Sequence, residues 1–535
     1  MNLLSPAQHI FLADTVRLDP WTRPVEALAV ANGKVVATGM RDDARTWGKQ
    51  AEVHDFGNAT ITPGLIDAHS HAVSAGVNRR GAELVRCGSL TEVVRTLLDQ
   101  KADESCEWLL GWSLDPNLFQ GKPPTNAFLT ACADRPVFVS MADGHSAVVN
   151  PAALHRAGVT GRERFDSVSS VVCDEKGEPT GLLLEDEALT LIRSVIPLLN
   201  EKERATSLLQ LLTGMAQSGL TTLSLLDLNE STLPTLAQME LKSTLPIRLR
   251  CSPVFEPGPN PVEELAHVLE LQRHHGKRWL VEGVKFVLDG TIENGTAWLS
   301  TPDSVGESRE SLWFEPSNYR TAVRALAERS IATATHAIGD AAIRYAVSTI
   351  AELSTEQRTR APHRIEHVEV MPDDLLQAFI LSGAIASMQP THSTLYVWPD
   401  HKDEWSRRLG TERAKLDGFR FRDLVDTGVT VALGSDWPVA PYDPRGIIAD
   451  AQLRRPHGRA DAGRTFPRQQ LTAGMALDSY TLSAARAIGW QDRIGALSVG
   501  MNADLAIFEL DPLGEDPEAF ASSAVLGTAI DGQLV

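Results

Sequence analysis

Two histidines separated by one residue, His69 and His71, are the side chains in this sequence best suited to bind a metal ion. They follow an apolar stretch, residues 61–66, which predicts a buried strand. Because side chains two residues apart in a strand lie on the same side, both imidazoles should face one point. A borderline-soft cation such as zinc would be bound there. The alternative is a pair of polar residues in an exposed loop.

Four more candidate residues stand at or near the ends of other apolar, β-branched stretches: Lys285, His336, His367 and Asp436. Lys285 lies within a stretch apolar enough to be a buried strand, so its ammonium must be paired, deprotonated or chemically modified. Taken singly, a histidine at a strand end is often only hydrogen-bonded, and an aspartate often caps a helix. Together with His69 and His71 they predict a metal site.

The elements that would position these residues form a repeating pattern of strand-like and helix-like segments, typical of parallel βαβ units. Eight strand-like stretches occur, at residues 61–71, 220–227, 247–253, 281–289, 331–336, 363–369, 384–389 and 429–436. Eight such strands predict an α/β fold with a (β/α)8 TIM-type barrel, whose active site lies at the carboxyl ends of the strands.

Connection lengths and turn signals divide the chain into an insertion, a barrel domain and a domain made by the two chain ends. Residues 74–207 are too many for a simple crossover after barrel strand 1, so we expect an insertion there that covers the active site. The chain ends, residues 1–60 and 488–535, contain short β segments and turn signals such as Asn32-Gly33. We therefore expect a small bipartite β-sandwich domain built from both chain ends, with the barrel domain at residues 61–487.

Composition limits the classes of partner. The chain has 535 residues and a formal net charge of -19, from 50 basic and 69 acidic residues. Such a charge disfavours a nucleic-acid partner. There is no long apolar segment and no leader-like N-terminus, and five cysteines are scattered without a pairing pattern. We expect a cytoplasmic protein with a small-molecule substrate, no membrane partner and reduced thiols; a homodimer is compatible with the sequence.

The order His-x-His, Lys, His, His, Asp on strands one, four, five, six and eight resembles the amidohydrolase superfamily. Local motifs resemble its YtcJ-like branch, which includes N-substituted formamide deformylases. They are Pro-Gly-Leu-Ile-Asp-Ala-His-Ser-His at 63–71, Asp-Gly-His-Ser at 143–146, His-Ala-Ile-Gly-Asp at 336–340, Arg-Ile-Glu-His at 364–367 and Gly-Ser-Asp-Trp-Pro-Val at 434–439. The resemblance extends over nearly the whole chain.

The resemblance implies a metal-dependent hydrolase of amide-type C–N bonds with one or two divalent ions, zinc being favoured. His69 and His71 would bind the more buried ion, and His336 and His367 the more exposed one. Lys285, carbamylated by carbon dioxide, would bridge the two. Asp436 would bind the first ion and act as general base and acid. The ions would lower the pKa of bound water and polarise the substrate carbonyl.

Two other functions stay open: deamination of a heterocycle at a one-metal site, and a non-catalytic metal-binding barrel. Lys285 and the Ala-Ile-Gly-Asp that follows His336 favour hydrolysis over deamination. Candidate substrate contacts are His145, Trp112 and His392, each of which loop hydrogen bonding or core packing would also explain. Relatives often carry an arginine after Glu-Asn near residue 295, where this chain has Gly295, so the deformylase's specificity does not transfer directly.

Overall fold

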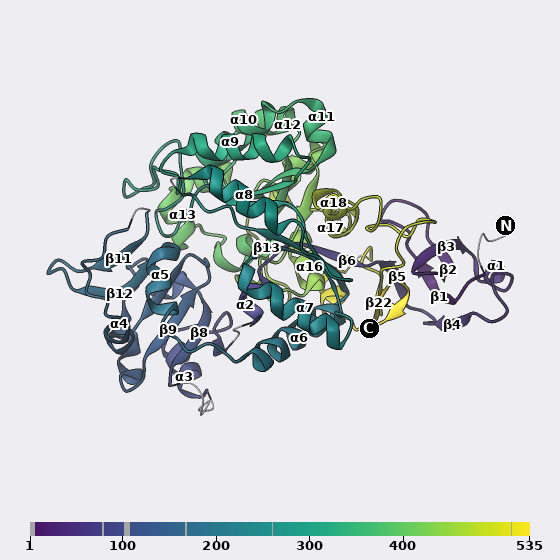
Figure 1. The fold of residues 1–535 in the computed structure, drawn as a ribbon, viewed down its shortest axis with the longest axis horizontal. Coiled ribbons are helices and arrows are strands. Elements are labelled where there is room, and N and C mark those ends of the chain that lie inside the picture. Colours follow the sequence, from purple (N-terminus) through teal and green to yellow (C-terminus); the bar gives the residue numbers. More distant parts are fainter. Residues whose placement is uncertain (1–5, 78–79, 101–106, 166–167, 259, 515) are drawn as a thin grey trace.

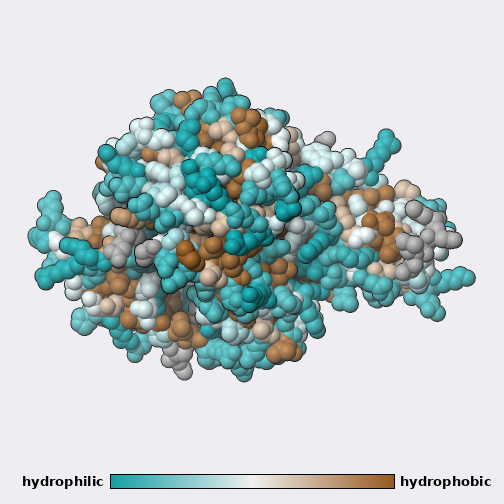
Figure 2. All heavy atoms as spheres, turned by 45° about the horizontal axis from the view of Figure 1, so that its top comes forward, coloured by the Kyte–Doolittle hydropathy of each residue, from teal (hydrophilic) through white to brown (hydrophobic). Residues whose placement is uncertain are grey.

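The computed structural model describes residues 6–77, 80–100, 107–165, 168–258, 260–514 and 516–535. Figure 1 shows an elongated molecule with three regions in a row. A central α/β region lies between a sheet made by both chain ends and a second α/β unit that contains β8 to β12. The face in Figure 2 is mostly hydrophilic, with apolar side chains in small separate groups.

The central region contains parallel strands in two hydrogen-bonded groups. One group has the order β15 (Trp279–Val281), β14 (Arg248–Pro253), β13 (Leu220–Leu228), β6 (Leu65–Ser70). The other has the order β16 (Val284–Val287), β17 (Thr333–Ala337), β18 (His363–His367), β19 (Ile385–Met388), β20 (Val431–Leu433). Each of the eight stretches expected from the sequence therefore contains a strand.

Backbone hydrogen bonds join the two strand groups on both sides. Phe255 N donates to Lys285 O at 2.8 Å, next to β14 and β16. At the other side Asp436 N donates to His69 O at 2.8 Å, and His71 N donates to Trp437 O at 2.9 Å. These bonds place the ends of β6 and β20, which are far apart in the sequence, side by side.

The stretch at residues 61–71 differs from the expectation of one continuous strand. It is divided at Gly64: β5 (Thr60–Pro63) pairs with the strands of the chain ends, whereas β6 pairs with β13. A Cβ atom at Gly64 would lie 2.3 Å from the side chain of Thr221, so the close approach of the two backbones requires glycine. The boundary expected between residues 60 and 61 therefore falls within β5, just after its first residue, Thr60.

Amphipathic helices cover the central strands. In α10 (Asp340–Ala351) the buried residues Ala342, Ile343, Ala346, Val347 and Ile350 follow the helical period, so one side packs on the core. The longer helices are α6 (Glu201–Gln217), α7 (Leu233–Lys242), α8 (Pro261–Leu271), α9 (Pro316–Ala327), α12 (Asp373–Ser382), α16 (Pro444–Leu453) and α17 (Ala473–Tyr480). Shorter ones are α2 (Ala72–Val77), α11 (Thr355–Arg360), α13 (Glu404–Leu409), α14 (Thr411–Asp417), α15 (Phe421–Asp426) and α18 (Leu482–Ala487).

The segment between β6 and β13 contains a sheet of its own. Its order is β11 (Ser170–Cys173), β12 (Pro179–Leu184), β10 (Ser146–Val149), β9 (Val137–Met141), β8 (Leu109–Leu114), β7 (Ala82–Glu83). Alternate residues of β9 enter two different apolar cores, Val137 and Val139 on one face and Phe138 on the other. The helices α3 (Leu90–Leu98), α4 (Pro151–Ala157) and α5 (Glu185–Arg193) pack around it.

Strands from both chain ends form one sheet at the other extremity of the molecule (Figure 1). Its order is β23 (Gln533–Leu534), β22 (Val525–Ile530), β21 (Leu505–Phe508), β5, β1 (His9–Val16), β2 (Val25–Ala31), β3 (Lys34–Gly39), and β4 (Glu52–Asp55) pairs with β1. Asn32 and Gly33 both have positive φ, as the tight turn between β2 and β3 requires. Two short helices, α1 (Arg41–Ala44) and α19 (Pro517–Ser522), belong to the terminal segments.

The structure also bears on the state of the cysteines and on the search for membrane-spanning helices. Cys87, Cys132, Cys173 and Cys251 are free thiols, and Cys106 lies outside the described residues. Within the described ranges, no helix has the length and apolar character needed to cross a membrane.

Candidate metal centre

The two histidines of β6 and its end are each oriented by a carboxylate. His69 Nδ1 lies 2.7 Å from Glu366 Oε2, and His71 Nδ1 lies 3.0 Å from Asp227 Oδ2. An Nδ1–H that donates to a carboxylate leaves the Nε2 lone pair free, the arrangement typical of a metal-binding imidazole. The two Nε2 atoms lie 3.3 Å apart. The strand therefore presents two ligand atoms to one point, as the His-x-His spacing predicts.

Asp436 completes this first group of donors. Its Oδ1 lies 3.0 Å from His71 Nε2 and 3.3 Å from His69 Nε2. Although Oδ1 is buried, no donor among the described residues makes a hydrogen bond of good geometry with it. Tetrahedral zinc with bonds of about 2.0–2.1 Å would separate its ligand atoms by roughly 3.3–3.4 Å. The donor set and its spacing fit a zinc-sized divalent ion.

The backbone at Asp436 is held in place by Asp67, a residue of β6. Asp67 Oδ1 accepts hydrogen bonds from His69 N at 3.1 Å and Ser435 N at 3.0 Å, and Oδ2 accepts one from Ser435 Oγ at 2.6 Å. Burial raises the pKa of Asp67 to about 7. Asp436 itself has φ 55°, in the left-handed region that non-glycine residues seldom adopt. The Asp67 bridge fixes this backbone against β6.

Protonation of the histidines depends on their surroundings. Burial, followed by the positive charge of Lys285, lowers the pKa of His69 well below its ordinary value, so its imidazole is neutral. Burial also acts against the charged form of His71, but Asp227 and Asp436 outweigh it and raise its pKa to about 10. In the metal-free protein His71 is thus a cation, and a metal ion would have to displace its proton.

His367, His392 and Asp436 form a second group of donors, whose ligand atoms lie within 4.8 Å of one another. His367 Nδ1 lies 2.9 Å from Gln389 Oε1, and His392 Nε2 lies 3.5 Å from Asp436 Oδ2. His392 Nε2 is buried and has no hydrogen-bond partner among the described residues. The sequence placed His392 among substrate contacts, and its closeness to Asp436 was not foreseen.

His336 lies beside this second group but belongs to neither set of three. Its ring centroid is 4.4 Å from that of His367, while its Nε2 lies 3.3 Å from Gly290 O. Burial lowers the pKa of both histidines well below the ordinary value, so both rings are neutral. Both imidazoles are thus in the form a metal ion requires.

Lys285 occupies β16 and is buried in the same cavity. Burial lowers its pKa to about 8, partly opposed by the carboxylates of Glu366 and Asp436. A substantial fraction of its amine is therefore neutral near pH 8. A neutral amine is the form that reacts with carbon dioxide, which makes carbamylation chemically accessible at this position.

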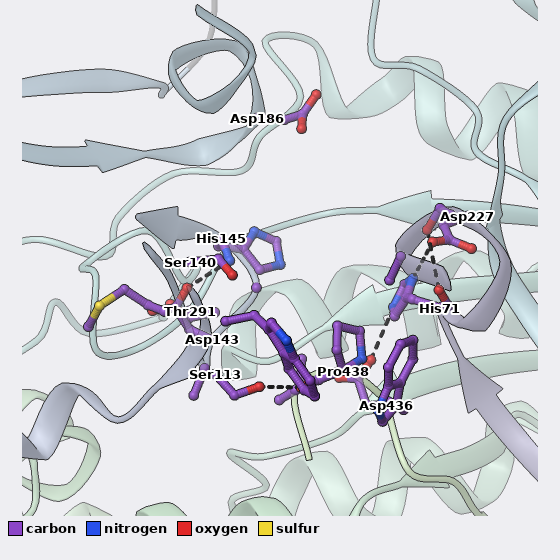
Figure 3. A pocket seen from close by; sticks show the side chains of 18 of the residues that line it. His71, Ser113, Ser140, Asp143, His145, Asp186, Asp227, Thr291, Asp436 and Pro438 are labelled. Carbon is purple, nitrogen blue, oxygen red and sulfur yellow. Dashed lines mark hydrogen bonds and ion pairs between the residues drawn. The ribbon is translucent and has the colours of Figure 1, made fainter. Parts of the chain in front are cut away.

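A cavity of about 740 Å³ opens over these residues, with walls from the central strands and from the insertion. Figure 3 shows His71, Asp227 and Asp436 on one side and His145, Ser140 and Asp143 on the other. The three substrate-contact candidates, His145, Trp112 and His392, all line the cavity.

The insertion reaches the donors through His145. Its Nδ1 lies 2.8 Å from Glu185 Oε2, and its ring centroid is 5.1 Å from that of His336. Burial disfavours the charge of His145, but Glu185 and Asp143 outweigh it and raise its pKa to about 9. Trp112 packs edge-to-face on Trp437, with ring centroids 5.8 Å apart. The insertion therefore supplies a cationic and an aromatic side chain to the cavity.

Residues 52–535 match the model of the amidohydrolase family, nine-tenths of the chain. The chain belongs to this family. It is similar to the protein LONG AFTER FAR-RED 3 of Arabidopsis thaliana, with 27% identity over 95% of this chain and 88% of the relative. It is also similar to the putative amidohydrolase YtcJ of Bacillus subtilis, with 25% identity over 95% of this chain and 96% of the relative. A third relative is N-substituted formamide deformylase of Arthrobacter pascens, with 24% identity over 98% of this chain and 97% of the relative.

Solved structures share the fold of this chain. A metal-dependent hydrolase of unknown function from Pyrococcus horikoshii OT3 has a TM-score of 0.72 and 25% identity, covering 95% of this chain and 99% of the other. An adenosine deaminase from Xanthomonas campestris with bound zinc shares the fold at a TM-score of 0.51 and 15% identity, covering 99% and 93%. The chain is a metal-dependent hydrolase of the amidohydrolase family that acts on C–N bonds, as the sequence predicts.

Proposed function

We propose that the protein hydrolyses a non-peptide, amide-type C–N bond in a small molecule, such as an N-formyl, N-acyl or cyclic amide. The observation that carries the proposal is the convergence of His69 Nε2, His71 Nε2 and the buried Asp436 Oδ1 at one point beside the cavity. Support comes from a full-length relative named as a formamide deformylase and another named as an amidohydrolase.

His69, His71 and Asp436 would hold one divalent ion, and His336 and His367 a second, with a carbamate on Lys285 between them. Zinc is the favoured ion, since imidazole and carboxylate ligands suit it and a neighbour of similar fold is described with zinc. When bound, the metal supplies a more acidic water and polarises the carbonyl of the substrate. His392 lies near Asp436 Oδ2 and would orient that carboxylate or the substrate.

Asp436 would carry the proton through the reaction. Its carboxylate would accept a proton from the attacking water and deliver it to the nitrogen that leaves, so that the C–N bond breaks to a carboxylic acid and an amine. The left-handed backbone and the Asp67 bridge fix this carboxylate relative to His69 and His71. Such fixed placement lowers the entropic cost of reaching the transition state.

The insertion would recognise the substrate. His145, held by Glu185, presents its other ring nitrogen for a hydrogen bond to substrate, and Trp112 offers an aromatic wall. Residue 295 is glycine and brings no charge, so recognition of a charged substrate would depend on residues such as His145. The substrate class would then differ from that of the deformylase.

The proposed architecture places this site at one end of a barrel. The two groups of parallel strands would close into a (β/α)8 barrel spanning residues 61–487, with residues 74–207 as the insertion over the active site. Residues 1–60 and 488–535 would form the bipartite β-sandwich domain. The backbone bonds at Phe255 and Asp436 support closure of the strand groups on both sides.

A hydrolysis screen tests the proposal. Zinc-loaded protein is incubated with N-formyl, N-acyl, cyclic-imide and carbamate compounds, and release of amine and carboxylate is measured. We expect turnover of at least one class by the wild type and a loss of about 10²-fold or more in Asp436→Asn, the range expected for a general acid–base group. Asp186→Asn, on the cavity wall away from the histidines (Figure 3), is the matched control.

Two results would contradict the proposal. Full activity in Asp436→Asn would remove that residue from proton transfer. Release of ammonia from heterocyclic amines, with no amide hydrolysed, would favour the deaminase function instead.

A further inference from the structure

A second cluster of metal-binding side chains lies far from the cavity, in the sheet formed by the chain ends. His9, Glu52 and His54 offer three ligand atoms within 4.8 Å of one another. Strands β1 and β4 run parallel there, with His9 opposite Glu52 and Phe11 opposite His54. Figure 1 shows β1 and β4 at the extremity opposite the insertion. The proposed hydrolytic reaction makes no use of these residues.

The distances within the cluster suit a small divalent ion. His9 Nδ1 lies 3.2 Å from His54 Nε2. Glu52 contributes both carboxylate oxygens, Oε2 at 3.5 Å from His9 Nδ1 and Oε1 at 3.9 Å from His54 Nε2. Tetrahedral zinc, with bonds of about 2.0–2.1 Å, needs ligand atoms roughly 3.3–3.4 Å apart. Small rotations of the exposed Glu52 side chain would bring all three to that spacing.

The imidazoles are already oriented by their neighbours. The ring of His54 stacks on Phe11, with centroids 4.8 Å apart and planes at 26°, and lies nearly parallel to the ring of His9, with centroids 5.5 Å apart and planes at 22°. The His54 side chain is 16% exposed and that of His9 26%, so the nitrogens lie at the protein surface with access for an ion. Ligands held before binding lose less entropy when the ion arrives.

A hydrogen bond between the two imidazoles is the simpler explanation for the 3.2 Å contact, because one nitrogen can donate to the other. That bond gives no role to Glu52, whose carboxylate lies close to the same two nitrogen atoms. Two imidazoles and one carboxylate around a common point are instead a typical ligand set for zinc, nickel or copper(II). Calcium and magnesium, which prefer oxygen ligands, fit less well.

We propose that His9, Glu52 and His54 form a second divalent transition-metal site, in which the ion links β1 to β4. The fourth ligand would be water. β4 is a strand of four residues that pairs with β1, and three of its four residues are exposed. An ion shared by His9 on one strand and by Glu52 and His54 on the other would fix this short strand to the sheet. The site is structural and separate from catalysis.

Metal stoichiometry tests the site in the full-length protein. Protein whose active site has first been filled with zinc, and then freed of excess ion, is dialysed against increasing free zinc, and bound zinc is measured by mass spectrometry. The wild type should take up one further ion per chain. His9→Ala and His54→Ala should weaken that uptake by about tenfold or more, since loss of an outer-shell partner alone costs 10–100-fold. His155→Ala, an exposed histidine of α4, is the control and should bind as the wild type does.

A second variant guards against loss of the local fold. Glu52→Gln changes an exposed side chain and should leave the melting temperature of metal-free protein unchanged, while still weakening uptake of the further ion. Cobalt(II) bound at the site should give the strong visible absorption of tetrahedral coordination in the wild type, and less of it in Glu52→Gln. No further ion in the wild type, or equal uptake by wild type, His54→Ala and Glu52→Gln, would overturn the proposal.

Discussion

Glu366 and Asp227 hold the imidazoles of His69 and His71 with their Nε2 atoms facing each other. These carboxylates set which ring nitrogen carries the proton, so they decide whether a ligand lone pair points to the centre. Glu366 Oε1 also forms an ion pair with Arg364 Nε at 2.7 Å, and both side chains are buried. The orientation of the two imidazoles therefore depends on buried charged residues behind them.

At the residue scale, Lys285 gives a prediction about carbamylation. Its pKa of about 8 means that the amine is mostly protonated below this pH and mostly neutral above it. Because the neutral amine attacks carbon dioxide, carbamate formation in the metal-free protein, measured at a fixed concentration of dissolved carbon dioxide, should become faster as pH rises through about 8. Magnetic resonance of protein incubated with isotopically labelled bicarbonate, followed by addition of zinc, would measure it.

The control for this experiment is a second lysine. Lys285→Met should show no carbamate resonance, whereas Lys277→Met, a change at an exposed lysine, should retain it. A metal-loaded wild type with a plain amine at Lys285 would exclude the bridging carbamate.

At the scale of elements, the junction of β6 with the segment after β20 brings the first group of donors together. Asp67 accepts two hydrogen bonds from Ser435 across this junction and a third from His69 N within its own strand. Gly434 permits the close approach, since a Cβ atom there would lie 2.6 Å from His69 N. Close packing thus requires glycine two residues before Asp436. This junction aligns His69 with Asp436 although the residues that join them, Asp67 and Ser435, are 368 positions apart in the sequence.

Asp67 also predicts a pH dependence of stability. Its pKa rises from 3.8 to about 7 on folding. Between these values the unfolded chain loses a proton that the folded protein keeps, so this group lowers the free energy of unfolding as pH rises from about 4 to 7, and its effect is constant above that. Asp67→Asn should remove this dependence, and melting temperatures measured across this pH range would show it.

Asp67→Ala is the contrasting variant. It leaves three buried donors without an acceptor, which costs roughly 1–3 kcal/mol for each. A lower melting temperature at every pH, together with weaker zinc binding, is the expected result. If Asp67→Asn follows the wild-type pH curve, the protonation of Asp67 does not contribute to stability.

Features of the fold and site that depend on neighbouring residues in the sequence could be predicted, whereas those that depend on contacts between distant segments could not. The strands were predictable from local apolar patterns, and His69, His71 and Asp436 from the residue types at their ends. Glu366, Asp227 and Asp67 were not assigned roles, because the partner of a carboxylate inside a strand lies on a neighbouring segment that is distant in the sequence. The division at Gly64 was missed for the same reason: it depends on the approach of Thr221.

At the scale of the whole molecule, the cavity lies between two separately packed units. The insertion has its own apolar cores and is bonded to the central region by Asn117, whose side chain donates to Tyr396 O at 2.9 Å and accepts from Glu404 N at 2.8 Å. Ser113 Oγ donates to Pro438 O, next to Trp437. These bonds fix Trp112 and His145 over the donors, a relation that local sequence patterns do not reveal.

Removal of a bound metal ion should therefore lower the thermal stability of the central region. An ion held by β6 and by the segment after β20 joins two edges of the strand groups, and binding at a thousandfold excess over the dissociation constant stabilises by about 4 kcal/mol. Chelation should lower the melting temperature by a few degrees, and zinc should restore it. In Asp436→Asn the drop should be smaller; an unchanged wild type would contradict tight binding at this site.

The ligands of the first group span residues 69 to 436, and the strand that accompanies β5 in the terminal sheet, β21, begins only at Leu505. During synthesis, a nascent chain thus exposes His69 and His71 long before their third partner leaves the ribosome. Zinc encountered at that stage would meet only two of the three donors of this group. Binding by all three donors would consequently require synthesis of at least the first 436 of the 535 residues.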